Sequence, residues 1–128
     1  MKKKNKYGLT ALKSVQNYRD SYSIIEIWSR SAKEVFYTKS SQEKGCPKGT
    51  FLGLCEEGLV KGIPRGKYTR SEKNKNYALK AVSILKNNPN RVYSPKELWD
   101  KLELGNKRSN STIDVVIKLL FFSYLEIC

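Results

Sequence analysis

Apolar side chains recur at intervals of three and four residues along most of this chain. Such spacing places them on one face of an α-helix, whereas the alternation expected of a half-buried strand is almost absent. The clearest segment begins at Ser23 and carries Trp28, Ala32 and Val35 on one face. Ser23 and Glu26 have the spacing of a capping box, in which both side chains accept hydrogen bonds from amides at a helix start. The pattern predicts an all-α protein of about five to six helices.

Local chemistry marks where further helices begin. Pro47 suits a first turn, because no intrahelical hydrogen bond needs the amide hydrogen that proline lacks. Thr69 and Glu72 have the spacing of another capping box, and Pro95 follows Ser94 at the first position of a further helix. The expected helices cover residues 8–19, 23–36, 46–59, 69–87 and 94–105, with a last one from 111 onward.

The C-terminal segment is apolar nearly all round, with Val115, Val116, Leu119 and Leu120 among its residues. A helix of this composition has to be buried, because it has no polar face for solvent. β-branched and aromatic residues are frequent near its end. Residues 121–127 therefore fit either a short strand or a continued helix, and periodicity alone does not distinguish the two.

The length of 128 residues fits one compact domain, since two separate cores would each be marginal at this size. We expect a single helical domain over 1–128, with a basic, flexible N-terminus at 1–6 and flexible connections at 38–45 and 61–68. No run approaches the ~18 apolar residues of a membrane span, and no signal-peptide stretch follows the lysine-rich start. The sequence predicts a cytoplasmic protein that does not bind membranes.

Gly49, Gly53 and Gly58 stand in the third predicted helix. In a helix interior each costs about 1 kcal/mol relative to alanine. We interpret them as sites of close backbone approach, either by another helix of this chain or by a partner.

The charge balance is strongly basic, with 25 Lys and Arg against 12 Asp and Glu and a net charge of +13. Nucleic acid is the usual partner of such a protein, because neutralising its phosphates releases condensed counterions. The alternative is that the lysines only confer solubility on a Lys- and Asn-rich chain.

Between residues 61 and 75, six Lys or Arg residues stand against a single Glu. Gly62 and Gly66 let backbone amides approach a phosphate, and Arg65 and Arg70 can each hold one through two hydrogen bonds. Arg70 also follows Thr69 at a predicted helix start, where the helix dipole favours anions. A phosphate-binding loop and an ordinary exposed loop both fit this composition. The candidate residues are Lys61, Arg65, Lys67, Arg70, Lys73 and Lys75.

The three helices expected within residues 75–128 have the order of a helix-turn-helix core. Residues 95–102 would form the positioning helix, and the segment after Ser109 would form the recognition helix. Asp114 and the apolar body leave few side chains for reading bases, so we expect little sequence specificity. The residues that would face bases and phosphates are Lys107, Arg108, Asn110, Ser111 and Thr112.

Catalytic and metal-binding chemistry has little support. The chain contains no His, and no nucleophile elbow or phosphate-binding P-loop is present. Glu56 and Glu57 are adjacent, about 100° apart on a helix, so we interpret them as solvated charges rather than a converging pair. Cys46, Cys55 and Cys128 fit neither a metal knuckle nor a disulfide framework. We expect a non-enzymatic protein with reduced thiols, no cofactor and no metal.

The stretch from Lys44 to Pro64, KGCPKGTFLGLCEEGLVKGIP, resembles that of a small uncharacterised bacterial family. The resemblance extends from residues 5–10 through 77–82 to 114–116, which implies one integrated domain. It implies no activity and no functional residue.

Two functions follow as expectations. The first is a small nucleic-acid-binding protein that contacts the phosphates of DNA or RNA through its basic loop and helix N-termini. The alternative is a protein-binding inhibitor or adaptor from a phage or mobile element, acting on a host nucleic-acid-handling or defence protein such as a CRISPR effector. Its contact surface would be the glycine-rich third helix and exposed aromatic anchors. The residues assigned to that surface are Gly49, Gly53, Trp28 and Trp99.

Overall fold

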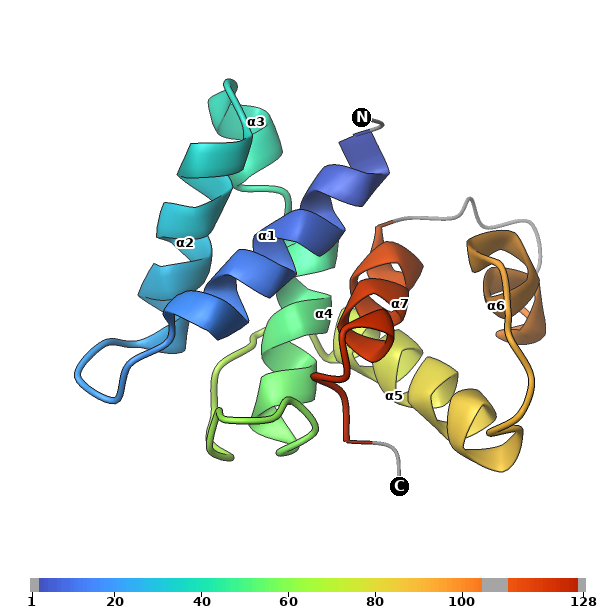
Figure 1. Ribbon diagram of the computed structural model, residues 1–128. Coiled ribbons are helices and arrows are strands. Elements are labelled where there is room, and N and C mark those ends of the chain that lie inside the picture. The colour runs from blue at the N-terminus through green and yellow to red at the C-terminus, as the bar shows by residue number, and fades with distance from the viewer. Residues whose placement is uncertain (1–2, 105–110, 127–128) are drawn as a thin grey trace.

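The computed structural model describes residues 3–104 and 111–126, and these form an all-α protein around one hydrophobic core (Figure 1). The helices are α1 (Lys3–Asn17), α2 (Ile24–Val35), α3 (Lys39–Gln42), α4 (Gly45–Glu56), α5 (Glu72–Asn87), α6 (Pro95–Lys101) and α7 (Thr112–Phe121). The predicted fold class is confirmed. Among the described residues, no helix is both long and apolar enough to cross a membrane.

Helix α7 occupies the middle of the fold, between α1 on one side and α4, α5 and α6 on the other (Figure 1). Ile113, Val115, Val116 and Leu119 are fully buried on it. Burial of each such side chain stabilises the fold by about 1.5–3 kcal/mol. This central position explains why the segment is apolar nearly all round.

Helices α1 and α2 pack against each other and carry the N-terminal part of the core. Ser23 caps α2 by accepting a hydrogen bond from the amide of Ile25, which confirms the predicted start. Helix α1 begins at Lys3, so residues 3–6, expected to be flexible, are helical. Tyr7 anchors this end, because its buried hydroxyl donates to the carbonyl of Ser41 at 3.0 Å.

The glycines of α4 allow α5 to approach closely. A Cβ atom at Gly49 would lie 2.9 Å from the Cβ of Ser71, and one at Gly53 would lie 2.7 Å from the Cβ of Lys75. Real Cβ atoms do not approach other atoms so closely, so both positions require glycine for the observed packing. The predicted close approach is therefore confirmed, and the approaching element is a helix of this chain.

Gly58 has a different role from the one predicted. Helix α4 ends at Glu56, so Gly58 lies beyond the helix, where its φ is +73°. Its amide donates to the carbonyl of Cys55, and the amide of Leu59 donates to that of Leu54. This is a Schellman motif, which requires a left-handed residue and so favours glycine.

Helix α7 ends in the same way, with Ser123 at a φ of 63°. The residues after the two motifs then meet: the amide of Lys61 donates to the carbonyl of Tyr124, and that of Glu126 donates to the carbonyl of Leu59. Val60 and Leu125 form an antiparallel bridge. Residues 122–126 are thus neither a continued helix nor a full strand, and residue 127 lies outside the described residues.

Candidate nucleic-acid interface

We define the basic loop as residues 61–71, which connect the C-terminal end of α4 to the start of α5 (Figure 1). Ile63 anchors it in the core, with 5% of its surface exposed. The hydroxyl of Tyr68 donates to the carbonyl of Pro64 at 2.6 Å, which closes the segment between them into a turn. The basic loop therefore has a defined path instead of the flexible one expected from the sequence.

The carboxylate of Glu56 fixes the end of the basic loop. One oxygen accepts hydrogen bonds from the amides of Tyr68 at 2.8 Å and Thr69 at 3.3 Å. Thr69 consequently belongs to the loop, and Ser71 is the residue that caps α5. The predicted start at Thr69 was wrong by two residues, and Arg70 lies before the helix instead of in its first turn.

The second oxygen of Glu56 binds Lys75, whose ammonium lies 2.5 Å from it. The same ammonium lies 2.8 Å from a carboxylate oxygen of Glu57. The adjacent carboxylates therefore converge on one cation, and the interpretation of both as solvated charges was wrong. The close approach of α5 at Gly53 makes this possible, because it brings Lys75 to the last turn of α4.

Lys75 was predicted to contact phosphates, but it is held inside this cluster. The side chains of Lys75 and Glu56 are 13% and 11% exposed. The hydrogen bond from Lys75, followed by that from the Tyr68 amide, lowers the pKa of Glu56 to about 2. The pKa of Lys75 is raised in turn, first by its hydrogen bond to Glu56. We call Glu56, Glu57 and Lys75 the charge cluster, because the two carboxylates neutralise the positive charge of Lys75.

The other five predicted phosphate-binding residues of this region are exposed. Among the described residues, none of their side chains takes part in an ion pair. Arg65 lies along Gly58, where an added Cβ would be 2.8 Å from the Cγ of Arg65. The aliphatic part of the Arg65 side chain therefore packs against the backbone of Gly58. The five exposed cations are Lys61, Arg65, Lys67, Arg70 and Lys73.

A groove of about 580 Å³ lies where the end of the basic loop faces the first turns of α4. Lys48 and Arg70 bring two cations to it, and Ile25 of α2 contributes an apolar wall. Sequence reasoning missed Lys48, although its position one residue after Pro47 already placed it in a first turn. The complete lining is Ile25, Gly45, Lys48, Gly49, Leu52, Tyr68, Thr69, Arg70 and Ser71.

The predicted recognition helix does not have the required exposure. Ser111 and Thr112 are buried, and the hydroxyl of Thr112 lies 2.8 Å from that of Thr50 in a hydrogen bond to α4. Helix α1 also covers one side of α7. Ser111 and Thr112 therefore face the core instead of a major groove, which contradicts their predicted contacts with bases and phosphates. Lys107, Arg108 and Asn110 lie outside the described residues.

The residues predicted to anchor a protein partner are also buried. Trp28 is 1% exposed and stacks on Phe51, with ring centroids 5.1 Å apart. Trp99 is 6% exposed, and Gly49 and Gly53 are covered by α5. These four residues support the core and are not available to a partner in this fold.

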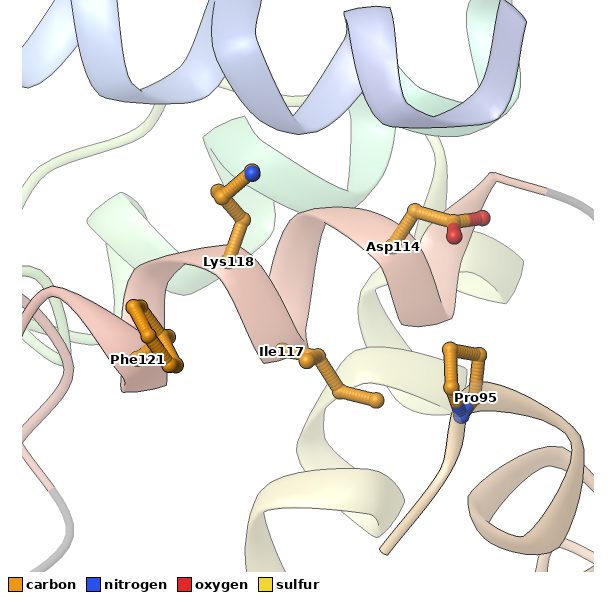
Figure 2. Close-up of a pocket in the computed structure, with 5 residues that line it drawn as sticks. All are labelled: Pro95, Asp114, Ile117, Lys118 and Phe121. Atoms are coloured by element: carbon orange, nitrogen blue, oxygen red, sulfur yellow. The ribbon is translucent and has the colours of Figure 1, made fainter. Parts of the chain in front are cut away.

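A smaller pocket of about 210 Å³ lies between the start of α6 and the outer face of α7 (Figure 2). Pro95, Ile117 and Phe121 give it apolar walls, and Asp114 and Lys118 bring one charge of each sign. Phe121 is 78% exposed, and its ring lies edge-on to that of Phe122, with centroids 5.3 Å apart.

The described cysteines are free thiols. Cys55 is fully buried, and this burial raises the pKa of its thiol. Cys46 is partly exposed at the start of α4, and Cys128 lies outside the described residues. Among the residues that the structure describes, no three acidic or cysteine side chains gather as metal ligands would.

The fold and the site define a small all-α protein with an exposed basic loop. The chain belongs to a family of unknown function, DUF6979, whose model matches residues 4–125. The match runs from the first turn of α1 past the end of α7. Searches of curated proteins and of solved structures gave no match.

Proposed function

We propose that this protein binds nucleic acid through its phosphates and that the basic loop is the principal contact surface. The observation that carries the proposal is the set of five exposed cations between residues 61 and 73, which form no ion pair among the described residues. The neighbouring Lys75 is neutralised by its own carboxylates. The net charge of +13 adds a long-range attraction for polyanions.

Phosphate contacts of this kind favour affinity over sequence specificity. Lysine and arginine side chains on a loop reach the nucleic-acid backbone, which is the same at every base pair. Each neutralised phosphate releases counterions and contributes about 0.9 to the slope of log affinity against log salt for duplex DNA. The proposed function is therefore non-enzymatic binding of DNA or RNA with little selectivity for sequence.

A salt titration by fluorescence anisotropy tests the proposal. Arg65→Ala, Lys67→Ala and Arg70→Ala are combined in a loop variant, and Lys33→Ala, Lys86→Ala and Lys96→Ala in a control. All three control lysines are exposed on α2, α5 and α6, and both variants have a net charge of +10. We expect the loop variant to lower the salt slope by about 2–3 and the control variant to lower it by less than about 1.

Two outcomes would overturn this proposal. If the wild-type protein binds neither labelled duplex DNA, single-stranded DNA nor RNA at low salt, it is not a phosphate binder. If the loop and control variants lose affinity equally, net charge alone drives the binding and the basic loop has no special role.

A second candidate function is binding to a protein partner, as an inhibitor or adaptor. The observation that favours it is Phe121, which is 78% exposed beside the pocket between α6 and α7 (Figure 2). Aromatic residues, Phe among them, are enriched in protein–protein interfaces relative to the rest of the surface. Phe121→Ser should abolish the capture of such a partner from a bacterial lysate while leaving nucleic-acid affinity unchanged.

A further inference from the structure

The groove beside the basic loop combines two kinds of chemistry. The ring of Tyr68 and the side chains of Ile25 and Leu52 provide apolar surface, while Lys48 and Arg70 provide positive charge. A nucleotide has the matching composition, because its base presents flat apolar faces and its phosphate is anionic. The volume of about 580 Å³ lies within the range of pockets that enclose small molecules, roughly 300–1,000 Å³.

We propose that this groove binds one nucleotide of a single-stranded nucleic acid. The base lies against Tyr68, Ile25 and Leu52, and the adjacent phosphate lies between Lys48 and Arg70. The inference rests on the proposed function, since Arg70 belongs to the basic loop. It adds the substrate class: an unpaired strand in place of a duplex.

The position of Tyr68 suits this role. Its hydroxyl donates to the carbonyl of Pro64 at 2.6 Å, and its ring lies so close to Gly66 that an added Cβ there would be 2.7 Å from the Cζ of Tyr68. The ring is therefore held in place before any base arrives. A fixed ring loses little conformational freedom on binding, which favours affinity.

The shape of the groove explains the preference for a single strand. Residues 68–71 of the basic loop form one side and the first turns of α4 the other, and Ile25 of α2 adds a third wall. In a duplex the faces of each base are covered by its neighbours in the stack. A base must leave the stack to place its face against Tyr68, and in an unpaired strand it does so at little cost.

Gly45 offers a way to close the groove without disturbing the fold. It lines the groove, and a Cβ atom added to it would meet nothing within 4 Å. Gly45→Leu should therefore place a side chain in the space of the base. The matched control is Ser83→Leu, which adds the same side chain to an exposed position of α5, about 18 Å further along that helix than Ser71.

The experiment compares fluorescein-labelled dT20 with a 20-base-pair duplex of arbitrary sequence, by anisotropy at one salt concentration. We expect the wild type to bind dT20 more tightly, although the duplex has the higher charge density. Gly45→Leu should weaken dT20 binding about ten-fold, as expected for loss of a stacked base, and change duplex binding by less than about two-fold. Ser83→Leu should change neither.

Two further measurements keep the test decisive. Ile25→Asn removes an apolar wall at a position that is already 36% exposed, and it should weaken dT20 binding selectively even if Gly45→Leu does not fold. When the complex with an oligonucleotide that contains 5-iododeoxyuridine is irradiated, the modified base should cross-link to Tyr68. Mass spectrometry of the digested protein identifies the cross-linked residue.

The outcomes separate the two proposals. If the wild type binds dT20 and duplex equally, or if Gly45→Leu and Ile25→Asn bind dT20 as the wild type does, the groove does not hold a base, while phosphate binding by the basic loop stands. If the wild type binds neither of these probes nor single-stranded or duplex RNA at low salt, both proposals fail and a protein partner becomes the leading function.

Discussion

The charge cluster and the five exposed cations between residues 61 and 73 are neighbours in sequence and opposite in state. Lys75 is 13% exposed and binds two carboxylates, whereas Lys73, two residues earlier on the same helix, is exposed and has no ion pair among the described residues. Both lysines belong to one run of positive charge in the sequence. The comparison teaches that local charge density does not show which cations reach a ligand, because that depends on what packs beside each one.

The difference also predicts different consequences of mutation. A cation that is paired away from solvent supports the fold, and its removal leaves carboxylates without a counterion. An exposed cation contributes little to stability and is available for binding. Stability measurements on matched variants therefore distinguish the two regions.

The largest effect should come from Lys75→Met, which keeps the length of the side chain and removes its charge. We expect a loss of about 2–3 kcal/mol in the free energy of unfolding at pH 7, because Glu56, with only 11% of its side chain exposed, is left without its partner. Urea denaturation measures this change. Lys73→Met is the matched control and should cost less than about 0.5 kcal/mol. Equal losses in the two variants would remove the distinction between the regions.

The next effect concerns Glu56→Gln and its dependence on pH. The folded-state pKa of about 2 lies below the ordinary value of 4.5, so the carboxylate contributes stability above pH 4.5 that is lost as the pH falls towards 2. We expect the variant to lose about 1–2 kcal/mol at pH 7 and to approach the wild type near pH 2. Denaturant titrations between pH 2 and 7 measure the difference.

The control for this prediction is Glu43→Gln, since Glu43 is an exposed carboxylate at the end of α3. It should change stability by less than about 0.5 kcal/mol over the same range. A loss in Glu56→Gln that is as large at pH 2 as at pH 7 would show that the charge of Glu56 is not what stabilises the fold.

Glu57→Gln tests whether the two carboxylates of the charge cluster contribute differently to stability. The side chain of Glu57 is 39% exposed and lies 2.8 Å from Lys75, so solvent screens the pair more than it screens Glu56. We expect a loss of about 0.5 kcal/mol, typical of an exposed ion pair. A loss as large as that of Glu56→Gln, measured in the same urea titration, would contradict this ranking.

The smallest effect on stability should come from the loop variant with Arg65→Ala, Lys67→Ala and Arg70→Ala. Its free energy of unfolding should stay within about 0.5 kcal/mol of the wild-type value. At low salt the variant should be slightly more stable than the wild type, because the repulsion among positive charges is smaller. Thermal unfolding by circular dichroism checks this. A large destabilisation would show that the loop cations support the fold. A loss of nucleic-acid affinity in this variant would then reflect unfolding and not the removal of phosphate contacts.

Helix starts show how far local sequence signals reach. Helix α6 begins where Ser94 and Pro95 predicted, and Ser94 and Glu97 form a capping box there whose two hydrogen bonds are both local. At α5 the predicted cap was Thr69, and Ser71, two residues later, carries a hydroxyl as well. Glu56, twelve or more residues away, holds the amides of Tyr68 and Thr69 in the loop, so Ser71 became the cap. A distant hydrogen bond decided between two locally acceptable starts.

The candidate site was predictable in part. The run of six cations at 61–75 was visible in the sequence, and the structure leaves five of them exposed. The capture of Lys75 and the contribution of Lys48 were not predictable. Both depend on α5 lying against α4 at the distance that Gly49 and Gly53 allow, and on the loop end facing the first turns of α4.

Local sequence signals were sufficient to predict the helical class, most helix starts and the close approach at Gly49 and Gly53, because spacing, caps and missing side chains act within a few residues. The packing of the helices was needed to establish that α7 is the central helix, that Trp28 and Trp99 are buried, and which cations remain exposed. These outcomes depend on contacts between helices far apart in the chain. A local pattern shows that a residue is apolar or charged, and the packing of the whole fold decides which surface it meets.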